Sequence, residues 1–163
     1  SDLKKNNYIF LAFSGEEKGL IGSDKFLTNG NYQKERINYM IDLDMIGRLD
    51  AKKKIKIYGT GTSDSWDKAI DNVGDKGFKI TRIKTGIGGS DHTSFSQHKI
   101  PAVFIHTGLH EDYHKAVDDC NLINSEGENE VIKYAYSLIR YLDDKGKITY
   151  QIAGMLDEIM LKK

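Results

Sequence analysis

The sequence predicts an α/β domain with a mixed, largely parallel sheet that is flanked by helices. Short apolar or alternating runs of strand length recur along the chain, and segments with helical periodicity separate them. Strands that alternate with helices are typical of α/β domains. The chain has 163 residues, which is enough for one sizeable core. We therefore expect residues 1–163 to form a single domain.

Five runs are expected to form the strands. Residues 8–13 (YIFLAF) are continuously apolar, which indicates a strand buried on both faces. Residues 54–58 (KIKIY) alternate, so this strand is expected nearer an edge of the sheet. The other three strands are predicted at residues 37–44, 78–83 and 102–106.

Four segments have the apolar spacing of helices. The first covers residues 17–29 and is expected to end at Gly30. The second begins at Ser63, and the third follows a capping box formed by Ser125 and Glu128. The apolar positions are Leu20, Ile21 and Leu27 in the first helix, Trp66, Ile70 and Val73 in the second, Val131, Ala135, Leu138 and Leu142 in the third, and Ile152, Met155, Leu156, Ile159 and Met160 in the last.

Composition narrows the classes of function. Lys and Arg number 24, and Asp and Glu also number 24, so no excess of positive charge favours nucleic acid or an acidic membrane surface. No apolar run approaches the roughly 18 residues of a membrane span. The one cysteine, Cys120, excludes an intrachain disulfide.

Polar residues gather where the predicted strands end, which is the edge at which α/β sheets bind ligands. Glu16 and Glu17 follow the first predicted strand, and Asp44 ends the second. The alternation of a strand places Asp42 on the same face as Asp44. All five histidines lie within residues 92–114.

These residue types suit a hydrolytic metal site. Zinc takes histidine nitrogens and carboxylate oxygens, keeps a position open for water, and needs a base nearby. The adjacent Glu16 and Glu17 can divide the roles of base and ligand between them. The same pair also fits a simpler hypothesis, negative charge at a helix N-terminus, which the helix dipole favours. The chain has no G-x-S-x-G, and residues 59–64 (GTGTSD) lack the P-loop lysine, so a serine triad and a P-loop are disfavoured.

Four motifs follow one another along the chain: FSGEEKGLIGSDKFL, IDLDMIGR, GGSDHTSF and GLHEDYHKAVDD. In order and spacing they resemble the co-catalytic di-zinc aminopeptidases, a family that includes aminopeptidase Y, aminopeptidase S and bacterial leucyl aminopeptidase. Glutamate carboxypeptidase II is a more distant relative. The resemblance runs from about Tyr8 to about Tyr141. It implies a zinc-exopeptidase fold and a metallopeptidase that removes the N-terminal residue of a peptide.

The resemblance also implies roles for individual residues. Glu16 matches the general base, and Glu17 matches a ligand of one zinc ion. His114 matches a second ligand of that ion, and Asp44 matches a ligand of the other zinc ion. Tyr113 matches a hydroxyl that hydrogen-bonds the tetrahedral oxyanion in some relatives.

Further expectations follow from the same resemblance. Asp91 and His92 match a motif that lines the site, and a supporting role is expected for both. Two zinc ions are the expected cofactors, and a peptide is the expected substrate. Family habit favours a secreted or periplasmic location, although no signal peptide is visible in this chain.

The chain also departs from the family pattern. The family has two more ligands, a histidine and an aspartate that bridges the metals, upstream of the strand that leads to GEE. This chain has no histidine before His92, so we expect it to be the C-terminal part of an aminopeptidase catalytic domain that carries half of the metal site. The expected partner is the N-terminal half or a second copy of the chain. Two alternatives remain: a non-catalytic interaction domain similar to the transferrin receptor, and a zinc acyltransferase similar to glutaminyl cyclase.

Overall fold

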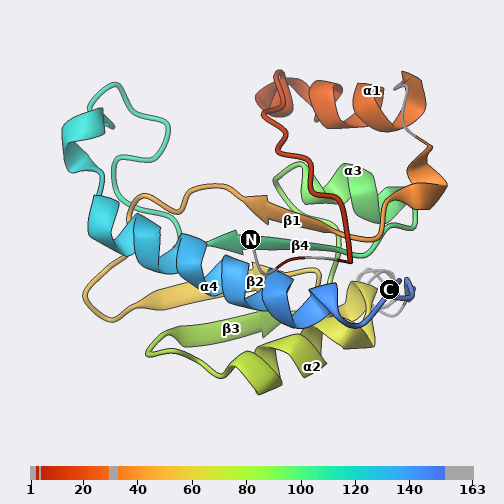
Figure 1. Cartoon of the computed structure of the whole chain (residues 1–163). Helices are drawn as coiled ribbons and strands as arrows, with labels where there is room; N and C mark the ends of the chain where they lie inside the picture. The colour runs from red at the N-terminus through yellow and green to blue at the C-terminus, as the bar shows by residue number, and fades with distance from the viewer. Residues whose placement is uncertain (1–2, 4, 30–32, 153–163) are drawn as a thin grey trace, which may run out of the picture.

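The computed structural model describes residues 3, 5–29 and 33–152, and its four strands form one mixed sheet (Figure 1). The strands are β1 (Met40–Leu43), β2 (Lys54–Tyr58), β3 (Lys79–Ile83) and β4 (Ala102–His106), in the spatial order β1-β4-β2-β3. β1 runs parallel to β4 and β2 runs parallel to β3, whereas β2 and β4 are antiparallel. The predicted fold class is therefore confirmed, and β1 and β4 end at the same edge of the sheet.

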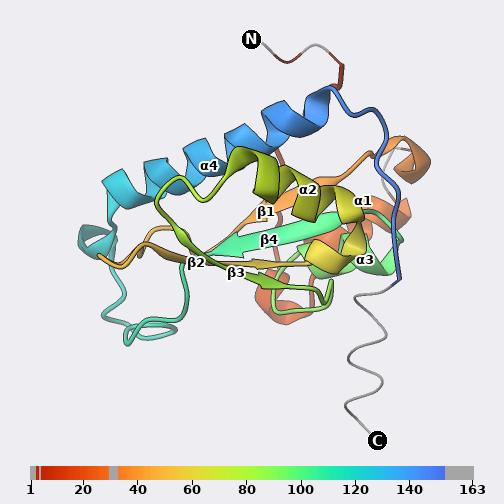
Figure 2. The same ribbon diagram turned by 90° about the horizontal axis from the view of Figure 1, so that it is seen from below.

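Helices cover the two faces of the sheet unequally. The helices α2 (Asp64–Val73) and α4 (Ser125–Asp143) pack on one face (Figure 2). The shorter helices α1 (Ile21–Asn29) and α3 (His92–Gln97) lie on the other face, beside β1 and β4. The main core joins β2 and β4 to α2 and α4 through Ile55, Ile57, Val103, Ile105, Trp66, Ile70, Val131 and Leu138.

The prediction that Lys54–Tyr58 lies nearer an edge is wrong. This strand, β2, lies between β4 and β3. Its alternation has another cause: Ile55 and Ile57 are completely buried under α2 and α4, whereas Lys54 and Lys56 are exposed on the opposite face. A strand alternates wherever only one face of the sheet is covered, whether or not it is an edge strand.

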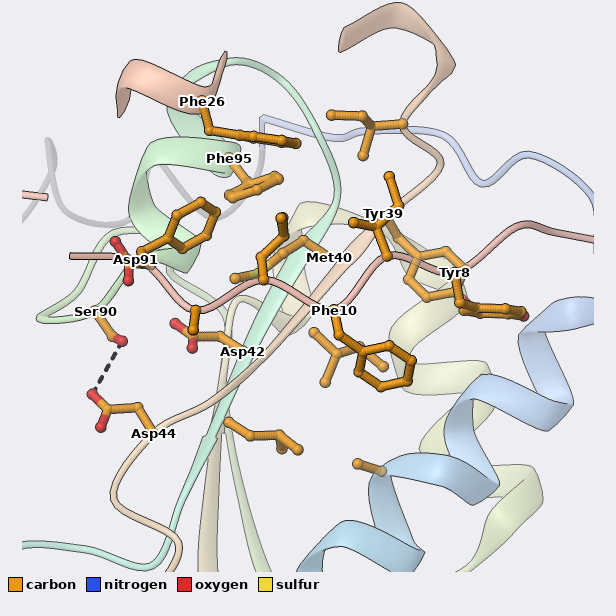
Figure 3. A pocket seen from close by; sticks show the side chains of 18 of the residues that line it. Tyr8, Phe10, Phe26, Tyr39, Met40, Asp42, Asp44, Ser90, Asp91 and Phe95 are labelled. Atoms are coloured by element: carbon orange, nitrogen blue, oxygen red, sulfur yellow. Dashed lines mark hydrogen bonds between the residues drawn. The ribbon is translucent and has the colours of Figure 1, made fainter. Parts of the chain in front are cut away.

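The predicted strand at residues 8–13 is also wrong. No strand is assigned there, and Ile9, Phe10 and Leu11 are 53%, 97% and 43% exposed. The segment runs beside β1 across a cleft of about 1560 Å³ rather than pairing with it (Figure 3). An apolar run becomes a buried strand only where neighbouring strands pair with it on both sides, and no described strand does so. The name β1 cleft is used below for this space, which residues 5–13 and 36–45 line on opposite sides.

The helix boundaries differ from the predicted ones at two places. The first helix begins at Ile21 rather than at residue 17, because Gly19 and Leu20 have positive φ angles of 99° and 59°. A short 3-10 turn, Glu16–Lys18, precedes it. Helix α4 is capped by Asn124 rather than by the predicted Ser125 box, since its side chain accepts a hydrogen bond from the N–H of residue 127.

Other helix predictions hold. Ser63 caps α2 by accepting a hydrogen bond from the backbone of Ser65, and the predicted α4 stripe is buried. Gly30 and the predicted last helix after Ile152 lie outside the described residues. Within the described part of the chain, no helix combines the length and apolar character that crossing a membrane requires.

Candidate functional site

The β1 cleft collects most of the residues that the sequence singled out. Its walls include Glu16, Glu17, Asp44, Asp91 and Tyr113, of which Asp44 and Asp91 are labelled in Figure 3. These side chains come from the turn before α1, the end of β1, the loop before α3 and the loop after β4. Segments far apart in the sequence therefore place one base candidate, two ligand candidates and one hydroxyl around the same space. His92 and His114 do not line it.

The strand β1 fixes two carboxylates of the site. Asp42 is almost completely buried and accepts a 3.0 Å hydrogen bond from the backbone N–H of His92. Asp44, two residues later on the same face, accepts a 3.2 Å hydrogen bond from the hydroxyl of Ser90. The loop that carries Ser90 and Asp91 is thus attached to both carboxylates. Sequence reasoning missed Ser90, although its place in the GGSDHTSF motif is a signal that could have indicated it.

The cleft carries a concentration of negative charge. Burial raises the pKa of the Glu16 carboxyl, and the carboxylates of Glu17 and Asp44 raise it further. Burial also raises the pKa of Asp44, although the hydrogen bond from Ser90 opposes this effect. The pKa of Asp91 is raised mainly by burial, with further contributions from Asp42 and Asp44. Carboxylates that raise one another's pKa favour a bound cation or a shared proton.

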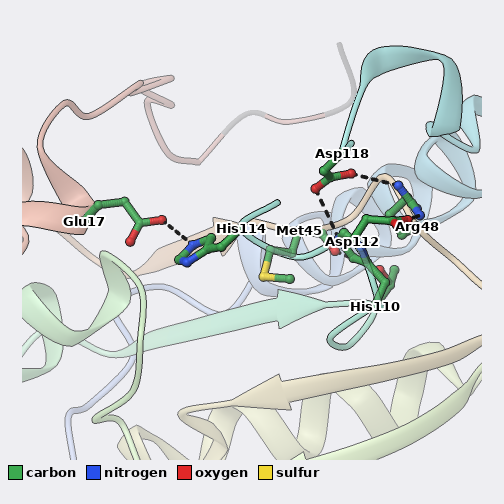
Figure 4. A network of polar contacts seen from close by, with 8 residues as sticks. Glu17, Met45, Arg48, His110, Asp112, His114 and Asp118 are labelled. Carbon is green, nitrogen blue, oxygen red and sulfur yellow. Dashed lines mark hydrogen bonds and ion pairs between the residues drawn. The ribbon is translucent and has the colours of Figure 1, made fainter. Parts of the chain in front are cut away.

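Glu17 and His114 meet directly at the open side of the site. The Nε2 atom of His114 lies 2.8 Å from Oε1 of Glu17, and both side chains are more than half exposed (Figure 4). The ring of Tyr113 stacks on His114 with 3.9 Å between ring centroids. The backbone of His114 has a positive φ of 58°. The structure therefore brings together the two residues that were expected to share one zinc ion.

The remaining histidines stand apart from the cleft. His92 is completely buried and its ring stacks on Phe104 with 5.0 Å between centroids. His106 is also buried, and its Nδ1 atom accepts a 3.1 Å hydrogen bond from the N–H of Gly108. Burial and the neighbouring Lys56 lower the pKa of His106, so its ring is neutral near pH 7. His92 donates its backbone N–H to Asp42, and its supporting role stays a prediction.

The donor atoms fit zinc in type. Zinc in proteins is held by histidine nitrogen and carboxylate oxygen, which are the atoms that His114 and Glu17 bring together. Among the described residues, no group of three His, Cys, Asp or Glu side chains converges on one point. Asp44 is engaged with Ser90 instead. The pair would therefore supply two donors to one ion, and the assignment of Asp44 to a second ion stays a prediction.

Several solved structures with the same fold are described as aminopeptidases, and another is described as the γ-secretase component nicastrin. LapA aminopeptidase from Legionella pneumophila is 24% identical, with a TM-score of 0.65 over 78% of this chain and 37% of that one. An aminopeptidase from Aneurinibacillus sp. strain AM-1 is 24% identical, with a TM-score of 0.62 over 85% and 33%. BSAP, a zinc aminopeptidase from Bacillus subtilis, is 21% identical, with a TM-score of 0.61 over 78% and 34%. The chain thus spans about a third of the length of these relatives.

The family assignment rests on a separate comparison. A search of curated proteins found no match. The family model described as peptidase family M28 matches residues 1–139, which is most of the chain and includes each candidate site residue. The chain therefore belongs to peptidase family M28.

Proposed function

We propose that the chain is part of a zinc-dependent aminopeptidase that hydrolyses the N-terminal peptide bond of a peptide. The observation that carries this proposal is the direct contact between Glu17 and His114, beside a cleft whose walls include Glu16 and Tyr113. Carboxylate ligands, a base and a hydroxyl donor thereby line one cleft, and the histidine ligand contacts Glu17. Family membership and the zinc aminopeptidase among the structural relatives support the same function.

Glu16 would act as the general base. A base works best when its pKa lies close to the operating pH, and burial together with Glu17 and Asp44 raises the pKa of Glu16 in that direction. The carboxylate lines the cleft, where it would take a proton from the attacking water and pass it to the leaving amine. The carboxylate would thus transfer one proton from the water to the amine and end the cycle unprotonated.

The other residues would bind and orient. Glu17 and His114 would hold one zinc ion, and Asp44 would contribute to a second. When bound, zinc supplies Lewis acidity that lowers the pKa of water and polarises the peptide carbonyl. The hydroxyl of Tyr113 would donate a hydrogen bond to the oxyanion. Asp91 and His92 would support the site, since the backbone N–H of His92 holds a buried carboxylate of β1.

The test is the variant Glu16→Gln in the complete native enzyme. Glutamine keeps the shape of the side chain but cannot accept a proton, so turnover of an aminoacyl-nitroanilide should fall by about 10³-fold or more while zinc content stays unchanged. Glu35→Gln is the matched control, because Glu35 is exposed and does not line the β1 cleft. Near-normal turnover by Glu16→Gln would refute the assignment of the base.

A further inference from the structure

The loop that follows β4 carries Tyr113 and His114 but has little structure of its own. Residues 107–119 contain turns and no helix or strand, and most of residues 111–119 are exposed. His114 has a positive φ of 58°, a conformation that residues other than glycine seldom adopt. Since the loop buries little apolar surface, it depends on backbone hydrogen bonds, such as that from Thr107 N–H to the Met45 carbonyl, and on contacts made by polar side chains.

Arg48 supplies such contacts. It lies four residues beyond Asp44, and its guanidinium binds the carboxylates of both Asp112 and Asp118 (Figure 4). The Nη1 atom lies 2.8 Å from Oδ1 of Asp118, and Nη2 bonds Oδ2 of Asp112. The three side chains are only 21%, 29% and 34% exposed. Partly buried charge-assisted hydrogen bonds of this kind are among the stronger ones, so Arg48 joins two points of the loop to the end of β1.

Ring and ion contacts continue from these carboxylates to the site. Asp112 immediately precedes Tyr113 in the chain. Oδ2 of Asp118 lies 3.6 Å from Nε2 of His110. The ring of His110 meets the ring of Tyr113 edge to face, with 6.2 Å between centroids. Tyr113 in turn stacks on His114, so an unbroken series of contacts leads from Arg48 to the ring that meets Glu17.

We propose that Arg48 is a positioning residue, whose contacts with Asp112 and Asp118 set the conformation of the loop and place the His114 ring against Glu17. The relevance of Arg48 to catalysis rests on the proposed function. Its effect on the position of His114 can be tested independently of that function. Arginine suits this role because its planar guanidinium donates to two carboxylates in a fixed geometry, which a lysine ammonium cannot reproduce.

The test is nuclear magnetic resonance of the 163-residue chain carrying Arg48→Met. A stacked aromatic ring shifts the resonances of its neighbour, so the ring protons of His114 should lose at least half of their displacement from free histidine values. Hydrogen exchange of the loop amides should accelerate about tenfold or more, because local opening becomes easier. Amides of α2 and α4 should keep their shifts. Arg48→Lys should restore the His114 shift in part.

Arg82 offers a matched control. It binds the carboxylates of Asp67 and Asp71 at 3.2 Å and 2.6 Å in the same two-carboxylate manner, on a surface formed by β3 and α2. Arg82→Met should leave the His114 resonances unchanged. The double variant Asp112→Asn with Asp118→Asn removes the same contacts without altering Arg48, and it should reproduce the His114 change of Arg48→Met.

Two results would overturn the proposal. One is an unchanged His114 shift in Arg48→Met or in the double aspartate variant. The other is an equal shift in Arg82→Met. Neither result depends on enzymatic turnover, so a failure here leaves the Glu16→Gln test standing. Conversely, normal turnover in Glu16→Gln would refute the assignment of Glu16 as the base. The His114 shift expected in Arg48→Met would stay the same.

Discussion

The phenol of Tyr8 donates a 2.7 Å hydrogen bond to Asp143, which lies 135 residues further along the chain. The carboxylate of Asp143 is almost completely buried and also accepts hydrogen bonds from the backbone N–H groups of Lys5 and Asn6. Burial and the bond to Asp143 raise the pKa of Tyr8 above its ordinary value, so the phenol remains a donor. These bonds attach the start of the segment that lines the β1 cleft to the end of α4.

Loss of this carboxylate should destabilise the fold. Asp143→Ala removes the buried acceptor of several partly buried donors, and we expect a loss of about 3 kcal/mol in the free energy of unfolding. Tyr8→Phe should cost less, about 1 to 2 kcal/mol, because the carboxylate keeps its other donors. Urea denaturation measures both. The exposed neighbour Asp144 provides the control, and equal losses for Asp143→Ala and Asp144→Ala would contradict the assigned role.

Zinc binding by the 163-residue chain should be weak. Two donors, Glu17 and His114, meet in the described structure, whereas catalytic zinc sites have three protein ligands and structural sites four. Titration calorimetry should give a dissociation constant above about 1 μM, which corresponds to a binding free energy weaker than about −8 kcal/mol. His114→Ala should abolish the signal, and His98→Ala should not. Tight stoichiometric binding by the chain would contradict this prediction.

Gly59 should tolerate no side chain. Its φ is +80°, and a Cβ atom there would lie 2.1 Å from the carbonyl oxygen of Ala102. Gly77 also has a positive φ, +89°, but a Cβ atom at that position would have no neighbour within 4 Å. Gly77→Ala should therefore cost only the backbone strain, about 1 to 2 kcal/mol, and Gly59→Ala about 3 to 5 kcal/mol because it adds a clash with backbone. Thermal unfolding measures both losses of stability. Equal losses for Gly59→Ala and Gly77→Ala would mean that Ala102 and the rest of β4 can move away from the added methyl group.

His106 should make stability depend on pH. Burial and Lys56 lower its pKa in the folded protein from the ordinary value of 6.5, so the unfolded chain binds a proton more readily. Its contribution to stability is therefore complete above pH 6.5 and declines as the pH falls below that value, until the folded pKa is passed.

The matching measurement is urea unfolding at several values between about pH 7.5 and 5.5, which bracket the ordinary histidine pKa. His106→Phe also loses the hydrogen bond from Gly108, which lowers stability at every pH, but it should flatten the decline below pH 6.5. An equally steep decline in His106→Phe would assign the effect to other groups.

The sequence predicted a helix or strand well where the pattern of its own apolar residues indicates which of its sides is buried. The stripe of α4 and the alternation of β2 are examples, since each pattern reports which side is covered. Residues 8–13 were mispredicted because the burial of an apolar strand depends on partners that its own residues do not specify. Asn124 and Ser125 are both good capping residues, and only the path of the backbone decides between them.

The site was predictable to a similar degree. Strand alternation correctly placed Asp42 and Asp44 on one face, since both accept hydrogen bonds from residues 90–92. The hydrogen bond of Ser90 to Asp44 spans 46 residues, and the contacts of Arg48 span 64 and 70. Contacts between residues so far apart in the sequence form only when the chain packs. No periodic pattern in the sequence indicates them.

The position of β4 in the sheet has a consequence for the order of assembly. β4 joins the two halves of the sheet, because it pairs with β1 on one side and with β2 on the other. It is also the last of the four described strands to be synthesised. Until residues 102–106 have left the ribosome, β2 and β3 can pair with each other, but β1 has no partner among the described strands. During synthesis, the edge that carries Asp42 and Asp44 therefore gains its described partner strand only after the strands of the other half of the sheet are already available.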